Sequence, residues 1–385
     1  MPEAVIVAAA RTPIGRAQKG SLKDARPDDL GAFAIQKALD KVPQLDPSEI
    51  VDVMCGCGFP EGEQGMNLGR RIALLAGLPD SVPGTTVNRF CASSLQTIRM
   101  AFHAIKAGEG DAFISAGVES ITRVNNMPRD MSELHPKLYG DDAIANVYIP
   151  MGLTAENVAE RFDVSRLEMD EYAQQSQMRA VAAQESGFYD REISPYTTPD
   201  GTVVSKDDGP RASSTLEKLQ SLPPAFKPDG GVVTAGNSCP LNDGGAAVVV
   251  MSEERARQLE IKPLARILAS AVSGIDPEIM GVGPIEAIRK VLKVTGMSIN
   301  DIDIVELNEA FAAQVIPVSR EIGFGYDKLN PHGGAIALGH PYGMTGARIM
   351  NTLLNDLQTL DKTFGLETMC VGGGQGMAMI IERVG

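Results

Sequence analysis

Two cysteines stand at junctions between expected elements, where a thiol can do chemistry. Cys91 lies between the strand-like run 85–87 and a helix whose apolar residues begin at Leu95. Free N–H groups and the positive dipole end at a helix start favour a thiolate, which is a prepared nucleophile. On position alone, a small buried thiol is an equally good interpretation. Cys370 ends an expected strand at the glycine cluster 372–374, where an acid–base thiol would fit, although a buried strand-end thiol is the commoner outcome.

Two further side chains could complete a site. His340 lies in the glycine-rich loop 333–341, where a histidine can polarise a thiol or an oxyanion near neutral pH. A loop histidine satisfied by backbone carbonyls is the commoner fate of such a residue. Asn308 follows the apolar strand expected to end near Val305, and strand ends carry the active-site groups of α/β sheets. A cap at a helix start is an equally good interpretation of Asn308.

The remaining cysteines and histidines indicate neither a metal site nor a disulfide framework. Five cysteines are too few and too scattered for disulfide stapling in 385 residues. Cys55 and Cys57 have no second pair for zinc and lack the spacing of redox motifs, so we interpret them as structural. Only four histidines are present, and we expect no metal.

The elements that must position these residues alternate between strand and helix patterns, which predicts an α/β architecture. Leu95, Ile98, Phe102 and Ile105 share one helical face before the next strand-like run. The C-terminal third repeats this order. The segment 48–54 is echoed by 300–306, with weak identity but matching elements, which indicates an internal duplication.

A different region separates the two halves. From about 121 to 240 the chain is rich in X-Pro steps and Asp-Gly turns and holds one polar helical stretch. Such regions often carry ligand contacts, so we expect an inserted loop domain there. The run 243–251 then reads as a buried strand that returns to the core.

Composition narrows the function classes. The net charge of −14 argues against nucleic acid as a partner. A phosphorylated small molecule would need a local basic patch, for which Arg11, Arg16 and their neighbouring cations are one candidate. No apolar run approaches the ~20 residues of a membrane helix. The N-terminus has no signal-peptide pattern, so we expect a cytoplasmic protein without a membrane span.

Taken together and in this order, the four reactive segments resemble the thiolase family. The resemblance covers essentially the whole chain. It implies a thiolase fold: two similar mixed α/β halves in an α-β-α-β-α arrangement with an inserted loop domain. We therefore expect an N-terminal half of 1–120 plus 241–263, a loop domain of 121–240 and a C-terminal half of 264–385. The motifs that carry the resemblance are Ala10–Pro13, Cys91, Val233–Asn237, Met280–Pro284, Asn308–Phe311, Gly339–Pro341 and Cys370–Gly372.

The resemblance also implies roles for the site residues. Cys91 attacks the 3-keto carbon of a 3-ketoacyl-coenzyme A and takes the acyl group, with His340 helping to keep it a thiolate. His340 and a water on Asn308 hold the enolate oxygen of the departing acetyl-coenzyme A. Cys370 protonates the enolate carbon and later deprotonates incoming coenzyme A. Backbone N–H groups of Cys91 and Gly372 meet the acyl-enzyme oxyanion, each worth roughly 3 kcal/mol of barrier.

Coenzyme A is expected as a substrate, with no permanently bound cofactor. By resemblance, Arg211 lies near its nucleotide phosphates, Met151 by the acyl–pantetheine pocket, and Cys239 in a segment that touches pantetheine. The chain departs from the family pattern at several places, which leave the acyl-chain length open. Pro150, where short-chain biosynthetic members carry histidine, favours a degradative enzyme. The other departures are Ser94, Cys239 with Pro240, and Pro331 with His332.

The resemblance favours an acetyl-CoA C-acyltransferase that cleaves 3-ketoacyl-CoA, in a homodimer or homotetramer. The alternative is a biosynthetic acetyl-CoA acetyltransferase that condenses two acetyl-CoA. A 3-ketoacyl synthase would lack a second catalytic cysteine, so Cys370 argues against that class. A non-catalytic acyl-CoA-binding relative would have no need for all four reactive side chains.

Overall fold

A single mixed β-sheet runs through the molecule. The computed structural model describes residues 2–124, 131–140 and 142–384. Within them the strands pair in the order β10-β11-β12-β9-β1-β8-β5-β3-β4, with the short β2 on β8. The strand bounds are β1 (Ala4–Arg11), β2 (Gly15–Arg16), β3 (Asp52–Gly56), β4 (Gly84–Val87), β5 (Ala112–Ser120), β8 (Asn242–Ser252), β9 (Ala265–Gly274), β10 (Ile304–Leu307), β11 (Phe364–Val371) and β12 (Gln375–Arg383).

The sheet consists of two copies of one pattern. In the first half, β3 pairs in parallel with β4 and β5, and β8 pairs antiparallel with β5 and β1. In the second half, β10 is parallel to β11, and β12 is antiparallel to β11 and β9. The counterpart of β4 is reduced to a parallel bridge between Val305 and Leu329. The prediction of two similar mixed α/β halves is therefore confirmed.

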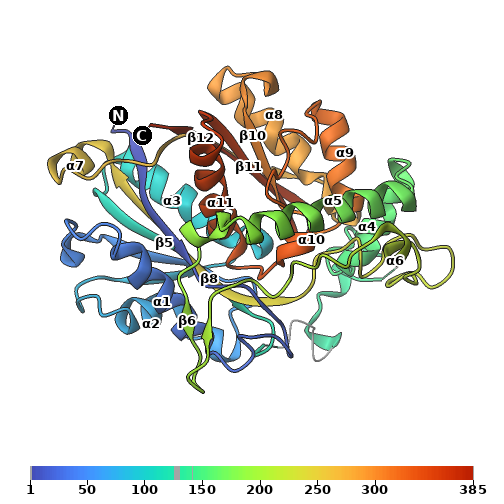
Figure 1. Ribbon diagram of the computed structural model, residues 1–385, viewed down its shortest axis with the longest axis horizontal. Helices are drawn as coiled ribbons and strands as arrows, with labels where there is room; N and C mark the ends of the chain where they lie inside the picture. Colours follow the sequence, from blue (N-terminus) through green and yellow to red (C-terminus); the bar gives the residue numbers. More distant parts are fainter. Residues whose placement is uncertain (1, 125–130, 141, 385) are drawn as a thin grey trace.

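Helices form three layers around the two half-sheets (Figure 1). In the middle, α3 (Ser93–Ala107) packs against α11 (Thr345–Thr359). The outer face of the first half carries α1 (Pro27–Leu39) and α2 (Leu68–Leu75), and that of the second carries α8 (Gly283–Thr295) and α9 (Ala312–Ile322). The layers follow the expected α-β-α-β-α order. The other helices are α4 (Met151–Arg161), α5 (Arg166–Glu185), α6 (Leu216–Gln220), α7 (Glu253–Gln258) and α10 (Ala335–Leu338).

Small residues let the two central helices touch at their starts. A Cβ added at Gly346 of α11 would lie 2.2 Å from the backbone nitrogen of Leu95 in α3. The Ser94 hydroxyl takes up the neighbouring position and accepts a 2.8 Å hydrogen bond from the Ala347 N–H. Because the helix starts adjoin, the segments that precede them also meet. Those segments carry Cys91 and His340, from opposite halves of the chain.

The region between the halves adds helices α4, α5 and α6 and the paired short strands β6 (Tyr196–Thr197) and β7 (Val203–Val204). Ser165 and Glu168 form a capping box that fixes the start of α5. Helix α5 then packs against α9 and α10 of the second half. Residues 125–130 and 141 of the expected loop domain lie outside the described residues.

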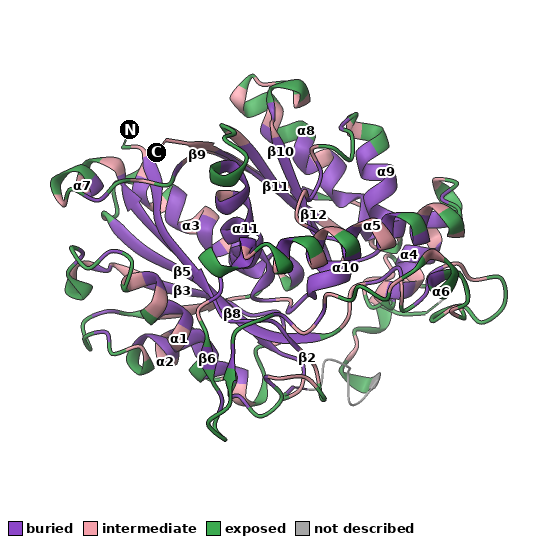
Figure 2. Cartoon of the chain, in the orientation of Figure 1, coloured by how far each residue is buried: buried purple, intermediate pink, exposed green. Residues whose placement is uncertain are grey.

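The core lies in the strands and in the faces of the helices that touch them (Figure 2). Every residue of β8 is buried, because this strand is covered on both faces. The exposed residues gather on the outer helices and connecting loops (Figure 2). Across the described ranges, no helix is both long enough and apolar enough to cross a membrane.

Candidate active site

The Cys91 segment is held in place from both halves of the chain. After β4, the Asn88 side chain accepts a 2.8 Å hydrogen bond from the Phe90 N–H, and Phe90 takes a left-handed φ of 42°. This turn opens a 3-10 helix, Phe90–Ala92, that runs into α3. The Arg89 guanidinium reaches across to Gln375 of β12, where Nη1 donates a 2.8 Å bond to Oε1. Cys91 thus lies, nearly buried, where the halves meet.

Burial of Cys91 works against the thiolate that the helix start favours. Burial raises its pKa from 9.0 to about 11, and Glu119 adds to the rise. The backbone N–H groups of Gly372 and of Cys91 itself act in the opposite direction, but they do not outweigh desolvation. The same contact places the Gly372 N–H at the Cys91 sulfur, where the sequence predicted an oxyanion site.

His340 is buried and neutral, and its orientation is fixed at both ring nitrogens. The Thr345 hydroxyl donates to the Pro341 carbonyl at 2.8 Å, so its oxygen accepts the Nδ1–H of His340 at 2.6 Å. Nε2 then carries the lone pair and lies 3.3 Å from Nδ2 of Asn308. Burial, with a smaller contribution from Arg348, lowers the pKa of His340 to about 3. In this neutral tautomer the base position is Nε2, which faces the Asn308 amide and accepts its N–H.

Asn308 is a strand-end group and does not cap a helix. It follows β10 directly, whereas α9 begins later, with Phe311 as its N-cap residue. Its Nδ2 faces His340, and its buried Oδ1 has no hydrogen-bond partner among the described residues. A buried acceptor of this kind requires a donor, which a water molecule or a substrate would supply.

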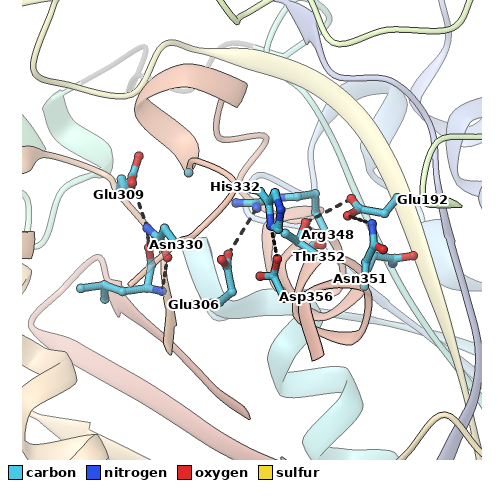
Figure 3. Close-up of polar contacts among 12 residues, drawn as sticks. Glu192, Glu306, Glu309, Asn330, His332, Arg348, Asn351, Thr352 and Asp356 are labelled. Atoms are coloured by element: carbon cyan, nitrogen blue, oxygen red, sulfur yellow. Dashed lines mark hydrogen bonds and ion pairs between the residues drawn. The ribbon is translucent and has the colours of Figure 1, made fainter. Parts of the chain in front are cut away.

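The next residue, Glu309, is a structural anchor. Its carboxylate accepts hydrogen bonds from the Tyr172 hydroxyl at 2.7 Å, the Ser176 hydroxyl at 2.6 Å and Nδ2 of Asn330 at 2.8 Å. The contact with Asn330 is drawn in Figure 3. The carboxylate also accepts from the Ile336 N–H of α10 at 3.1 Å. These bonds tie α5, α10 and the Asn308 segment together, and they leave Glu309 no free acceptor for chemistry.

A second buried polar cluster joins α11 to β10 and to the segment that carries His332 (Figure 3). Arg348 of α11 lies 4.0 Å from Glu306 of β10, and burial raises the pKa of that carboxyl well above its ordinary value. His332 lies with Nδ1 2.5 Å from Oδ1 of Asp356 and stacks on the Phe188 ring. His332 is one of the departures from the family pattern. Its contacts are with α11 and with Phe188, so we assign it a packing role.

Cys370 reaches the same site from the end of β11. Its Sγ donates to Oε1 of Gln314, in the first turn of α9, at 2.8 Å. Burial raises the pKa of Cys370 well above its ordinary value, and both Cys91 and Cys239 add to the rise. The two candidates Cys91 and Cys370 lie on segments that contact each other, the 3-10 helix Phe90–Ala92 and β11, despite their separation in sequence. Sequence reasoning missed Gln314, although its place in the first turn of a helix after Asn308 was a usable signal.

Two of the expected coenzyme A contacts, Met151 and Cys239, lie near Gly372 and Cys91. The Met151 sulfur and the Phe90 ring would lie 3.8 and 3.5 Å from a Cβ added at Gly372, so they flank that backbone. Cys239 is close enough to Cys91 for that neighbour to raise its pKa, after burial, which is the larger cause. Its N–H donates to the Ala310 carbonyl at 3.0 Å. Phe90, 39% exposed, is a lining residue that sequence reasoning missed.

Arg211 lies apart, on the surface. Its backbone N–H donates to Oε1 of Gln177 at 2.9 Å, and its guanidinium is near that of Arg16. Burial and then the Arg16 charge lower the pKa of Arg211. Arg16 belongs to the N-terminal basic stretch noted in the sequence. The two arginines therefore form a small cationic patch beside the loop region.

Cys55 and Cys57 are buried outside this group. Burial raises the pKa of both thiols far above the ordinary value, followed by the charge of Glu119. Their environment agrees with a structural interpretation. No group of three or more His, Cys, Asp or Glu side chains in the described ranges is arranged to hold a metal ion.

Comparison of this sequence with known proteins identifies its family. The model described as "Thiolase, N-terminal domain" matches residues 4–254, and "Thiolase, C-terminal domain" matches 261–383. The chain belongs to the thiolase family. It is 44% identical to a beta-ketoadipyl-CoA thiolase of Acinetobacter baylyi, with both chains fully covered. It is also 44% identical to a 3-ketoacyl-CoA thiolase of Bacillus subtilis, over 99% of this chain and 100% of the relative.

Solved structures agree with the fold. Human mitochondrial 3-ketoacyl-CoA thiolase in complex with CoA matches with a TM-score of 0.91 at 38% identity, covering 100% of this chain and 98% of that one. The Bacillus anthracis acetyl-CoA acetyltransferase matches with a TM-score of 0.91 at 39% identity, covering 100% and 99%.

Proposed function

We propose that this protein is an acetyl-CoA C-acyltransferase that cleaves 3-ketoacyl-CoA with coenzyme A, through an acyl-enzyme on Cys91. One observation carries the proposal: the segment of Cys91 packs against the end of β11 that carries Cys370, with the Phe90 ring beside Gly372. Such a pair fits a reaction in which one sulfur attacks carbon and the other moves a proton. The 3-ketoacyl-CoA thiolases among the relatives support this choice of substrate class.

In the first half-reaction, His340 accepts the Cys91 proton on Nε2 as the sulfur attacks the 3-keto carbon. The charged imidazolium forms only while negative charge develops on the substrate. The attraction between the two charges offsets the desolvation that keeps His340 neutral at rest. The carbon–carbon bond breaks, and the electron pair goes to the acetyl-CoA enolate. The new Nε2–H and a water on Asn308 hold the enolate oxygen. The N–H groups of Cys91 and Gly372 stabilise the oxyanion at the acyl carbon.

Cys370 completes both half-reactions as an acid–base group. Its S–H proton passes to the enolate carbon, the enolate pair becomes the new C–H bond, and acetyl-CoA leaves. The Cys370 thiolate then takes the thiol proton of incoming coenzyme A. The resulting sulfur anion attacks the acyl group on Cys91, and the Cys91 sulfur leaves as a thiolate. That thiolate takes back the proton held on Nε2 of His340, and the shortened acyl-CoA departs. Protons and electrons balance over the cycle without a redox partner.

Residues of the loop region bind coenzyme A. Arg211 meets its nucleotide phosphates, and the adjacent Arg16 supplies a second cation. Met151 and Cys239 line the path of the pantetheine and acyl chain near Gly372. We further propose a homo-oligomer in the cytoplasm, with coenzyme A as a substrate and without a resident cofactor.

The reverse direction, condensation of two acetyl-CoA, uses the same residues. The likeness to an acetyl-CoA acetyltransferase keeps it as the second candidate. Pro150, at the start of α4, favours the degradative direction in this chain.

The deciding experiment is a thiolysis assay. Short- and medium-chain 3-ketoacyl-CoA are mixed with coenzyme A, and the enolate absorbance is followed for wild type and for Cys91→Ala. We expect turnover in the wild type and none in the variant, with a chain-length profile that extends beyond acetoacetyl-CoA. Turnover restricted to acetoacetyl-CoA would favour the biosynthetic assignment. Coenzyme A binding with no turnover at any length would overturn the proposal.

A further inference from the structure

The side chain of Gln314 is the polar group closest to the proposed proton shuttle. It projects from the first turn of α9 and is completely buried. Its Oε1 accepts the Cys370 S–H at 2.8 Å, a short distance for a sulfur donor. Its Nε2 lies 3.4 Å from the Asn308 carbonyl, at the limit of a hydrogen bond. One amide therefore contacts both the shuttle thiol and the backbone of the residue that faces His340.

The surrounding structure holds this amide in position. A Cβ added at Gly281 would lie 2.8 Å from the Gln314 Cβ, so the 3-10 helix Pro277–Val282 approaches the glutamine closely because residue 281 is glycine. The Gln314 N–H is bonded to the Phe311 carbonyl at 3.1 Å. Gly281 belongs to the Met280–Pro284 motif noted in the sequence, and its contact gives that motif a role next to the catalytic thiol.

The chemistry of an amide suits a group that must stabilise an acid and a base in turn. A thiol needs an acceptor, and a thiolate needs a donor; a carboxamide offers both after half a turn of its terminal torsion. The Asn308 carbonyl favours the orientation in which Nε2 faces it and Oε1 faces sulfur. Cys370 is therefore held as the acid at rest. Thiolates at Cys91 or Cys239 would oppose a further negative charge on Cys370.

We propose that Gln314 is a positioning residue for Cys370, whose amide accepts the thiol proton in the acid form and turns to donate N–H to the thiolate in the base form. This inference rests on the proposed function for its catalytic part. The donated bond is charge-assisted and stronger than the accepted one, so the net effect of Gln314 is to make the thiolate easier to form. That direction agrees with its lowering effect on the pKa of Cys370.

Two variants separate the two uses of the amide. Gln314→Met keeps length and burial but removes the amide donor and acceptor. Gln314→Glu keeps an acceptor and loses the amide N–H donor, and once its carboxyl is ionised it has no donor. The readout is exchange of the acetyl-CoA methyl protons in D2O, followed by proton NMR, in which Cys370 acts as the base.

We expect Gln314→Met to slow exchange by about 10- to 100-fold, the usual effect of losing a hydrogen bond to a charged group. The KM for acetyl-CoA should stay within about twofold, because Gln314 lies beneath the thiol. Gln314→Glu should slow exchange further and move its pH profile to higher pH. The thermal midpoint and the rate of Cys91 alkylation by iodoacetamide serve as controls, because neither depends on proton transfer by Cys370.

Two outcomes of the exchange experiment would overturn the proposal. One is exchange in Gln314→Met within about twofold of wild type, with an unmoved pH profile. The other is a parallel fall in exchange, Cys91 alkylation and thermal midpoint, which would indicate a purely structural role for the glutamine.

A second measurement does not depend on the enzyme being a thiolase. In a Cys91→Ala background, the infrared S–H stretching band of Cys370 is assigned as the band that disappears when Cys370→Val is added. A hydrogen-bonded S–H absorbs at lower frequency than a free one, so the band should move to higher frequency in Gln314→Met. A band at the same frequency with and without Gln314→Met would overturn the resting-state hydrogen bond, whether or not the protein shows thiolase activity.

Discussion

The two halves of the molecule share a frame but differ in what their strand ends carry. Helix α3 spans Ser93–Ala107 and α11 spans Thr345–Thr359, so one constant shift in residue number superimposes them. The same shift relates the strand pair Val53 and Ile114 to the pair Val305 and Leu366. The duplication inferred from weak sequence identity is therefore seen in the structure, because the strand pairing and the central helices of the two halves match residue for residue.

Under that shift, three of the four reactive residues correspond to positions in the other half that carry glycine or valine. Cys370 corresponds to Val118, Asn308 to Gly56, and Cys91 to Gly343. The two glycines are required by packing. A Cβ at Gly56 would lie 2.3 Å from the backbone nitrogen of Ser94, and one at Gly343 would lie 2.3 Å from the Val118 carbonyl. The duplicated frame brings the two helix starts together, and divergence at the strand ends supplies the chemistry.

The largest effect is expected when Cys370 receives the residue of its counterpart. Cys370→Val removes the proposed acid–base thiol from a completely buried site and installs the apolar side chain that the corresponding strand carries at Val118. Thiolysis and acetyl-CoA methyl-proton exchange should fall by roughly 10²- to 10⁴-fold, the range of general acid–base catalysis. The matched control is Val118→Cys, which should keep activity close to that of wild type. Substantial exchange in Cys370→Val would mean that another group moves the proton.

Removing the amide of Asn308 should have the next largest effect. Asn308→Ala takes away Nδ2, which faces Nε2 of His340, and Oδ1, which lacks a described partner. The kcat of thiolysis should fall by roughly 10²- to 10³-fold, as for loss of one oxyanion donor, with little change in KM. Steady-state kinetics measure the split. A large rise in KM at constant kcat would place Asn308 in substrate binding instead.

The match between the two halves also predicts that Gly343 is important for stability. Gly343→Ala places a Cβ against the Val118 carbonyl and the Cys57 backbone, which cannot yield without moving strands. The free energy of unfolding should fall by about 1–3 kcal/mol, as overpacking usually costs. Gly274→Ala is the control, because a Cβ there meets nothing within 4 Å. Urea unfolding of both variants gives the comparison, and equal midpoints would contradict the close packing.

The last expected effect is on the pH dependence of stability. Burial lowers the pKa of His340 to about 3 in the folded chain, whereas an exposed histidine of the unfolded chain has a pKa of about 6.5. Between these two pH values the unfolded chain binds a proton that the folded chain does not bind. His340 therefore makes the free energy of unfolding fall as pH drops from about 6.5 toward 3, by at most about 1.4 kcal/mol per pH unit. His340→Asn, which installs the residue found at its counterpart Asn88, should lose less stability on acidification. Parallel acid curves for the two proteins would contradict a neutral buried imidazole.

The fold and much of the site could be predicted from the sequence. The alternation of strand and helix patterns, and the echo of 48–54 in 300–306, indicated the two halves in advance. The motifs named Cys91, His340, Asn308 and Cys370, and the structure brings all four to the start of the central helices. The division into 1–120 with 241–263, 121–240 and 264–385 stays a prediction.

What could not be predicted depends on three-dimensional environment. The helix dipole was the signal for a thiolate at Cys91, whereas the opposing effect of burial, which raises its pKa, depends on packing that the sequence does not show. Gln314 was missed because its partner Cys370 is remote in sequence, and only the fold brings the first turn of α9 to the end of β11. Phe90 was missed because its left-handed backbone, which directs the segment, leaves no pattern in composition.

The most direct test of the central claim is to trap the acyl group on Cys91. Wild-type protein is mixed with a 3-ketoacyl-CoA in the absence of free coenzyme A, quenched in acid, and digested for peptide mass spectrometry. We predict one acyl group on the peptide that contains Cys91, discharged when coenzyme A is added before the quench. Acylation of Cys370 or Cys239 in place of Cys91, or no covalent adduct during active turnover, would contradict this mechanism.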